Sequence, residues 1–277
     1  MKLKKLNFRR INLLIGVLFV GLVLVLAVAG YFYTPYDPLD GDLMAKFGPP
    51  SAAHWMGTDE FGRDVLSRIM AGAGVSVAVS LGTVLFATTA GTVVGVLTGY
   101  LGGWIDRIVM VFLESLMAFP GLLLALGIMA IVGPSKFGVV LALGLAYTPS
   151  VARIARATVF SLRQRDFVIA SQAMGNSGLW TVSRHILPNC IAPLIVFSTA
   201  LFGSALLAES ALSFLGLGVP PPAPSWGGML SDARNSMEQA VWLSVFPGAM
   251  ISFALLGINM LGDAVRDLLD PRMKGAH

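Results

Sequence analysis

Long stretches of mostly apolar residues alternate with more polar connections along this chain. A helix needs about 20 such residues to cross the hydrocarbon core of a bilayer. Stretches that reach or approach this length occupy residues 11–33, 75–100, 107–132, 137–157, 186–217 and 241–262. The pattern predicts an all-α integral membrane protein with about six transmembrane helices.

The distribution of Lys and Arg indicates how these helices are oriented. Of the 19 basic residues, 14 fall in the two tails and the connections on the same side as the tails. Because Lys and Arg accumulate in cytoplasmic segments, we expect both termini in the cytoplasm of a cell with an inner (plasma) membrane. The resulting division is a tail at 1–10, a first transmembrane helix at 11–33, an external segment at 34–74, a five-helix core at 75–263 with a cytosolic loop at about 158–185, and a tail at 264–277.

The first apolar stretch also has features of a secretory signal peptide. Five basic residues precede it, and Ala27-Val28-Ala29 resembles a cleavage site. Signal-peptide cores are about 7–15 residues long, whereas this stretch has 23 residues without a charge. A retained membrane anchor is therefore the favoured interpretation.

Two residues within the spans are candidates for a role in the transport pathway or its gating. Glu209 lies in the fifth stretch, and acids inside membrane helices are costly enough to suggest function. Pro120 interrupts the third stretch and is expected to kink it. A purely structural role remains open for both residues.

Composition excludes several kinds of chemistry. Hydrophobic residues make up 56% of the 277 residues and charged residues 12%, compared with about 25% charged residues in soluble domains. One cysteine excludes an internal disulfide and a cysteine-based metal cluster, and three dispersed histidines do not suggest a metal centre. No nucleophile and base are paired within the spans. We therefore expect no enzymatic activity, no cofactor, no metal and no nucleic-acid partner, with the lipid bilayer as the surroundings.

The second stretch carries small residues at regular intervals. Gly91, Gly95 and Gly99 recur every four residues and so share one face of a helix. Small faces allow membrane helices to approach closely, so this face predicts tight packing against a neighbouring helix.

The external segment 34–74 contains a run of glycine, acidic and basic residues. Its glycines suit tight turns, and Asp64 and Arg68 have the spacing of a pair that supports a short helix. A catalytic role for His54 with Asp59 is disfavoured because no nucleophile accompanies them. We expect a folded external lid, built around Gly57, Thr58, Asp59, Gly62, Arg63 and Asp64.

A proline-rich run at 218–228 precedes the last span. Its four prolines within five residues favour an extended path, and Trp226 is expected to anchor at the membrane interface. Contact with a partner and a simple bridge between helix ends are equally compatible with the run.

The loop at 158–185 predicts a short amphipathic helix outside the membrane. Asp166 suits its N-cap, and Gly175 suits the position that ends it. Phe167, Ala170 and Met174 form an apolar stripe between them. The stripe must be covered by a partner, by the chain itself or by lipid headgroups.

In these segments the chain resembles the C-type inner-membrane permease subunits of ABC importers of the dipeptide, oligopeptide and nickel class. The matching stretches are, in chain order, Gly57-Thr58-Asp59-x-x-Gly62-Arg63-Asp64, Gly99-Tyr100-Leu101-Gly102-Gly103-Trp104-x-Asp106, Ala118-Phe119-Pro120, Ala170-x-x-x-x-Gly175, Arg184-His185-Ile186-Leu187-Pro188-Asn189, Leu212-Ser213-Phe214-Leu215-Gly216-Leu217-Gly218, Pro224-Ser225-Trp226-Gly227 and Gly262-Asp263-x-x-Arg266-Asp267-x-x-Asp270-Pro271.

This resemblance implies a type I importer permease fold in which the chain forms half of a translocation pathway. It also implies a second homologous permease, two cytosolic ATPases that bind the ATP, and an extracytoplasmic binding protein that delivers the substrate. The chain has no G-x-x-x-x-G-K-[ST] phosphate loop, which agrees with ATP hydrolysis in partner subunits. Peptides, a nickel chelate, haem and glutathione all remain possible substrates.

The resemblance further assigns contact with an ATPase to the loop at 158–185. The family pattern there begins Glu-Ala-Ala and continues to a glycine. The corresponding residues here are Ile169, Ala170, Ser171 and Gly175, with Phe167 and Met174 on the same helix. Since the acid is replaced by Ile169, we expect apolar packing at this position rather than an ion pair.

A stand-alone secondary transporter is the alternative function from another class. Such a carrier needs sites for coupling ions and usually has inverted internal repeats. The sparse charges within the spans and the long external segment argue against it. An intramembrane enzyme is a third and weaker alternative.

Overall fold

The computed structural model describes the backbone of residues 2–269 and the side chains of residues 12–268. Helices dominate this range, and the described residues form no β-strand beyond an isolated bridge between Thr58 and Asp64. The elements are α1 (Lys2–Phe32), η1 (Leu43–Ala45), α2 (Val65–Leu101), α3 (Gly103–Met117), α4 (Gly121–Val132), α5 (Lys136–Leu162), α6 (Asp166–Ala173), α7 (Gly178–Thr181), the π-helical turn η2 (Val182–Ile186), α8 (Leu187–Phe214), α9 (Trp226–Ala233) and α10 (Trp242–Leu269).

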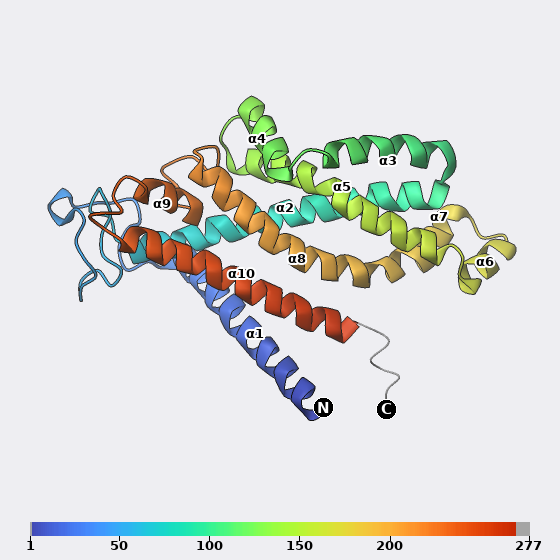
Figure 1. The fold of residues 1–277 in the computed structure, drawn as a ribbon, viewed down its shortest axis with the longest axis horizontal. Coiled ribbons are helices and arrows are strands. Elements are labelled where there is room, and N and C mark those ends of the chain that lie inside the picture. Colours follow the sequence, from blue (N-terminus) through green and yellow to red (C-terminus); the bar gives the residue numbers. More distant parts are fainter. Residues whose placement is uncertain (1, 270–277) are drawn as a thin grey trace.

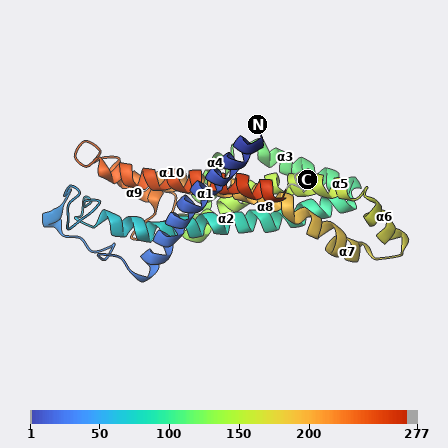
Figure 2. The same ribbon diagram turned by 90° about the horizontal axis from the view of Figure 1, so that it is seen from below.

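The molecule is an elongated bundle (Figure 1). Helices α2, α5, α8 and α10 run along its length, with segment 34–64 and α9 at one end and α6 and α7 at the other. Helix α1 crosses the bundle obliquely (Figure 2). The N-terminal end of α1 and the C-terminal end of α10 both lead away from segment 34–64 (Figure 1).

Within the described part of the chain, five helices are long and apolar enough to span a membrane, and α3 and α4 together make a sixth candidate. The all-α membrane fold expected from the sequence is confirmed. Several helices extend beyond the predicted spans: α2 begins ten residues earlier, at Val65, and α10 continues to Leu269. Asp270 and Pro271 of the last motif lie outside the described residues.

The third span is broken, and the break is sharper than the kink expected at Pro120. Helix α3 ends at Met117, α4 starts at Gly121, and the two axes differ by 90°. Pro120 has no N–H for a helical hydrogen bond, and its ring disfavours helical geometry at Phe119. The proline therefore separates two helices instead of bending one.

The glycine face of α2 packs against α5, as the sequence predicted. A Cβ added to Gly91 would lie 2.5 Å from the Cβ of Val151, and one added to Gly95 would lie 2.3 Å from the carbonyl oxygen of Ala152. These spacings are below any normal van der Waals contact. Only glycine permits this approach of the two helices.

A second close contact joins α1 to α10. A Cβ on Gly16 would lie 2.9 Å from the backbone nitrogen of Leu261, and one on Gly257 would lie 2.8 Å from the Cβ of Phe19. The rings of Phe19 and Phe253 stack nearby, with centroids 5.1 Å apart. Small residues on both helices therefore hold the oblique α1 against the bundle.

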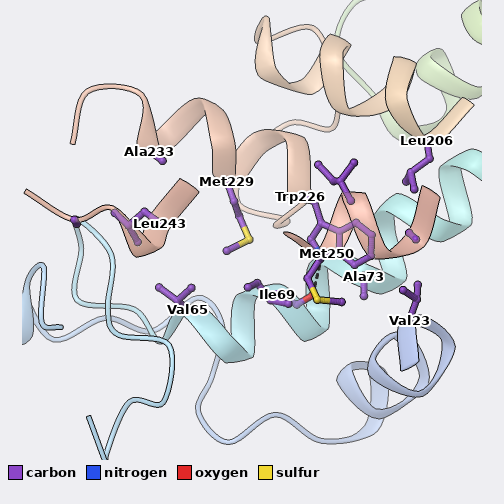
Figure 3. Close-up of a cluster of buried hydrophobic side chains, with 13 residues drawn as sticks. Val23, Val65, Ile69, Ala73, Leu206, Trp226, Met229, Ala233, Leu243 and Met250 are labelled. Atoms are coloured by element: carbon purple, nitrogen blue, oxygen red, sulfur yellow. Dashed lines mark hydrogen bonds between the residues drawn. The ribbon is translucent and has the colours of Figure 1, made fainter. Parts of the chain in front are cut away.

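Trp226 lies in a buried cluster at the end of the bundle near α9 (Figure 3). The interfacial position expected for it is therefore wrong. The indole is fully buried among side chains from α1, α2, α8, α9 and α10. Its Nε1 donates to the carbonyl oxygen of Ile69 at 3.1 Å, and its backbone nitrogen donates to Ser76 Oγ at 3.3 Å. Helix α9 folds back onto the core, so the residue locks α9 to α2 instead of meeting the membrane surface.

Candidate functional site

The segment between α5 and α8, residues 163–186, forms an elbow at one end of the bundle (Figure 1). Arg163 anchors its start, because Nη1 donates to the carbonyl oxygen of Gly99 at 3.1 Å and the guanidinium lies 5.8 Å from the centre of the Tyr100 ring. The elbow is thereby attached to the end of α2.

Helix α6 starts and ends almost as predicted. Its N-cap is Arg165, so Asp166 is the first helical residue and not the cap. At the other end Gly175 has φ +81°. The nitrogens of Gly175 and Asn176 donate to the carbonyl oxygens of Gln172 and Ser171 at 3.0 and 3.2 Å, which is the pattern of a Schellman termination.

One face of α6 is held against the rest of the chain. Val168 is fully buried in a cluster with residues of α2, α5 and α8. Ser171 is buried as well, and its hydroxyl lies 3.0 Å from the hydroxyl of Thr181 and accepts from Asn176 Nδ2 at 3.2 Å. Ser171 therefore braces α6 against α7 and does not point outward with its neighbours in the sequence.

The opposite face of α6 is apolar and exposed. The exposed fractions are 42% for Phe167, 52% for Ile169 and 73% for Met174, and Ala170 is also exposed. The predicted stripe of Phe167, Ala170 and Met174 is thus exposed, although Phe167 is partly covered by His185. An apolar surface of this kind on a braced helix is suited to docking another molecule.

Aromatic contacts extend this surface onto α7. The ring of His185 lies between Phe167 and Trp180, with centroid distances of 6.1 and 5.2 Å. His185 belongs to η2, which joins α7 to α8 without interruption. Pro188 is the second residue of α8, directly after this π-helical turn, and does not interrupt the continuous helix.

The external motif forms a compact structural cluster at the opposite end. Asp59 accepts from the backbone nitrogens of Phe61 and Arg63 at 2.9 and 3.0 Å and from Arg63 Nε at 2.7 Å. Asp64 is the N-cap of α2 and accepts from the nitrogen of Ser67 at 2.8 Å. Both carboxylates are thus saturated with donors, as expected for a scaffold and not for a reactive site.

The other motif residues close the same cluster. A Cβ on Gly62, which has φ +73°, would clash with the carbonyl of Asp42. The hydroxyl of Thr58 accepts from the nitrogen of Gly48 at 2.8 Å, and the carbonyl of Thr58 accepts from Trp242 Nε1 at 3.2 Å. Gly57 has φ +77° beside the same indole.

Charged residues in the cluster pair differently from the sequence prediction. Asp64 pairs with His54 at 2.9 Å and not with Arg68. Arg68 instead lies 3.4 Å from Asp59 and 3.4 Å from Asp232 of α9. Burial raises the pKa of Asp232, and the attraction of Arg68 opposes that rise. His54 likewise does not form the pair with Asp59 that a catalytic role would require.

The two candidates within the spans occupy different surroundings. Glu209 is fully buried in α8, where it accepts from Ser213 Oγ at 2.9 Å and contacts Ser210 Oγ at 3.5 Å. Pro120 is exposed at the break between α3 and α4. The structure does not bring these residues together, and only Pro120 lies on an open surface of the chain.

The sequence analysis did not identify an ion pair that fastens α3 to α5. Arg156 Nη2 donates to Asp106 Oδ2 at 2.6 Å, and Nε donates to the other carboxylate oxygen. Arg156 lies near the end of the fourth apolar stretch, and Asp106 follows the glycines at 102 and 103. Their pairing across 50 residues had no local signal.

Comparison with known proteins places this architecture in a family. Residues 91–275 match the family described as binding-protein-dependent transport system inner membrane component. The chain is 40% identical over 261 residues to a dipeptide transport system permease protein of Alkalihalophilus pseudofirmus, covering 94% of this chain and 86% of the relative.

Two further relatives cover similar lengths. A putative peptide transport system permease protein of Brucella suis is 41% identical over 266 residues, covering 96% of this chain and 90% of the relative. A glutathione transport system permease protein of Pectobacterium atrosepticum is 39% identical over 260 residues, covering 93% and 86%. With its helical spans and these matches, the chain belongs to the family of binding-protein-dependent transport system inner membrane components and is a multi-span transport permease.

Proposed function

We propose that this permease forms half of an ATP-driven import pathway for peptides or a related small solute. Its relatives include permeases named for dipeptide, peptide and glutathione transport. The pathway would be completed by a second homologous permease and powered by two cytosolic ATPases. A binding protein on the outer side would deliver the solute. Family membership favours this function over a stand-alone secondary transporter.

The exposed apolar face of α6 is the observation that carries the coupling part of the proposal. Val168 and Ser171 are buried and hold the helix against the rest of the chain, while Phe167, Ala170 and Met174 are exposed. We assign this face to a groove in an ATPase subunit. Apolar burial contributes about 25 cal/mol per Å², so the contact gains free energy without needing the missing acid at Ile169.

A pair of tryptophan substitutions tests this coupling. Ala170 and Gln172 are both exposed on α6, but only Ala170 belongs to the apolar stripe. We expect Ala170→Trp to abolish stimulation of ATP hydrolysis by the loaded binding protein in the assembled complex, and Gln172→Trp to retain it. A fully stimulated Ala170→Trp complex would contradict docking of the stripe.

We further propose that both termini and the elbow lie in the cytoplasm, with segment 34–64 outside. Ala52 in segment 34–64 and Gln172 in α6 are both exposed, so a cysteine at either position is accessible. These two elements lie at opposite ends of the molecule (Figure 1). In a Cys190→Ser background, an impermeant thiol reagent should label Ala52→Cys from the external side and Gln172→Cys from the cytoplasmic side. The reverse labelling would invert the proposed orientation.

A further inference from the structure

The break between α3 and α4 is an exposed segment in which the helical hydrogen-bond pattern is interrupted. Residues 118–120 are exposed. The hydrogen bonds of α3 end with Phe119 donating to Leu116 at 3.2 Å, and those of α4 begin with Leu124 donating to Pro120 at 3.0 Å. No side chain caps α4, so the N–H groups of its first turn have no partner within that helix.

This break lies far from both ends of the bundle. Helix α3 has 15 residues, so the break is about 22 Å from its start at a rise of 1.5 Å per residue. Tyr147 packs beside the break, with a ring carbon 3.9 Å from where a Cβ of Gly121 would lie. Tyr147 is eleven residues into α5 and so lies roughly 16 Å from the start of that helix. Helix α2 extends still further toward that end of the bundle (Figure 1). The break is therefore at membrane depth.

Polar side chains gather at the same place. Tyr147 Oη donates to the carbonyl oxygen of Ser204 in α8 at 3.2 Å, and Ser204 itself is exposed. Ser115, in the last turn of α3, is exposed as well. The outward face of α2 is different, because its large exposed side chains are apolar. They are Leu81, Leu85, Val93 and Leu97, spaced four or eight residues apart.

Irregular backbone at membrane depth occurs only in certain surroundings. Irregular segments facing lipid do not occur in the hydrocarbon region, because unsatisfied N–H and C=O groups are too costly there. Such segments persist where protein buries them or where they line a water-filled cavity. Here no described part of the chain covers the break, and the side chains around it include hydroxyl groups.

We propose that residues 118–120, Tyr147 and Ser204 line the aqueous translocation pathway and contact the solute as it passes. This inference rests on the proposed function, since it assigns that pathway to one face of this chain. A solute rich in amides is the chemical class that fits, because the hydroxyl oxygens of Tyr147 and Ser204 can accept and the N–H groups at the start of α4 can donate. The apolar stripe of α2 then faces lipid.

Cysteine reactivity in the assembled complex tests the assignment. The variants are Ser204→Cys and Ala118→Cys at the pathway and Leu85→Cys as an exposed apolar control, each in a Cys190→Ser parent reconstituted in vesicles. A cysteine thiolate, which forms in water and not in hydrocarbon, attacks a hydrophilic thiol reagent. We expect reaction at Ser204→Cys and Ala118→Cys to be at least about tenfold faster than at Leu85→Cys.

Uptake provides a second readout in the same vesicles. Labelling at the two pathway positions should block peptide uptake, whereas the control should keep it after the same treatment. If Ser204→Cys and Ala118→Cys react no faster than Leu85→Cys in a complex that imports peptide, this face is dry. The inference is then wrong, and a partner helix or lipid covers the break. Absence of ATP-driven uptake in the Cys190→Ser parent would contradict the proposed function instead. The labelling rates at positions 204, 118 and 85 would still show which face of the chain is in contact with water.

Discussion

Arg156 and Asp106 form a two-point ion pair that joins the end of α5 to the first turn of α3. The carboxylate accepts from both Nε and Nη2, a bidentate geometry that fixes direction as well as distance. Because α3 makes few other contacts with the bundle, this pair sets where α3 and the break after it lie.

Removal of this pair should loosen α3. We expect Asp106→Asn to lower the free energy of unfolding by about 1.5–3 kcal/mol, the range for hydrogen bonds to charged groups. Thermal unfolding of the purified complex measures the change. Arg153 is exposed on the same helix as Arg156 and has no ion pair with a described residue, so Arg153→Gln is the matched control. Equal effects of the two substitutions would contradict the role of the pair.

The contact between α2 and α5 should not tolerate a methyl group. In Gly95→Ala the new Cβ would lie 2.3 Å from the carbonyl oxygen of Ala152. Overpacking of this kind costs about 1–3 kcal/mol, and the amount of folded protein after detergent extraction should fall accordingly. Gly127→Ala in α4 is the control, because nothing lies within 4 Å of its added Cβ. A stable Gly95→Ala protein would mean that the helices can separate at little cost.

The buried indole of Trp226, with its N–H bound to Ile69, should contribute to stability. Trp226→Phe keeps an aromatic ring in the buried cluster but leaves the carbonyl oxygen of Ile69 without this donor. Unsatisfied buried polar groups cost about 1–3 kcal/mol, which should appear as a lower melting temperature. Trp104 is 74% exposed, so Trp104→Phe should leave the melting temperature unchanged. A similar loss in both variants would argue against the hydrogen bond.

Coupling at Ile169 should depend weakly on salt. Packing of an apolar side chain is not screened by ions, whereas an exposed ion pair is. We expect ATP hydrolysis stimulated by the loaded binding protein to change little between low and physiological salt in the natural protein. In an Ile169→Glu variant the stimulation should become salt-dependent if a basic residue lines the ATPase groove. Strong salt dependence in the natural protein would show that charge dominates this contact.

The sequence by itself determined the features that depend on local pattern. Lengths of apolar runs fixed the helical membrane architecture, because a bilayer demands about 20 residues per span. The recurrence of Gly91 and Gly95 indicated a close helix contact, and Gly175 marked the end of α6. In each case the physical cause is contained within one helix or one turn.

Only the tertiary structure decided which distant groups meet. Trp226 donates to a carbonyl 157 residues away. Arg68 forms ion pairs with Asp59 and with Asp232 of α9, and not with Asp64 four residues before it. Sequence periodicity places a residue on a face of its helix but does not say what that face meets. That depends on how the helices pack together, so the burial of Trp226, the pairing of Arg156 with Asp106 and the exposed break at Pro120 could not be read from local pattern.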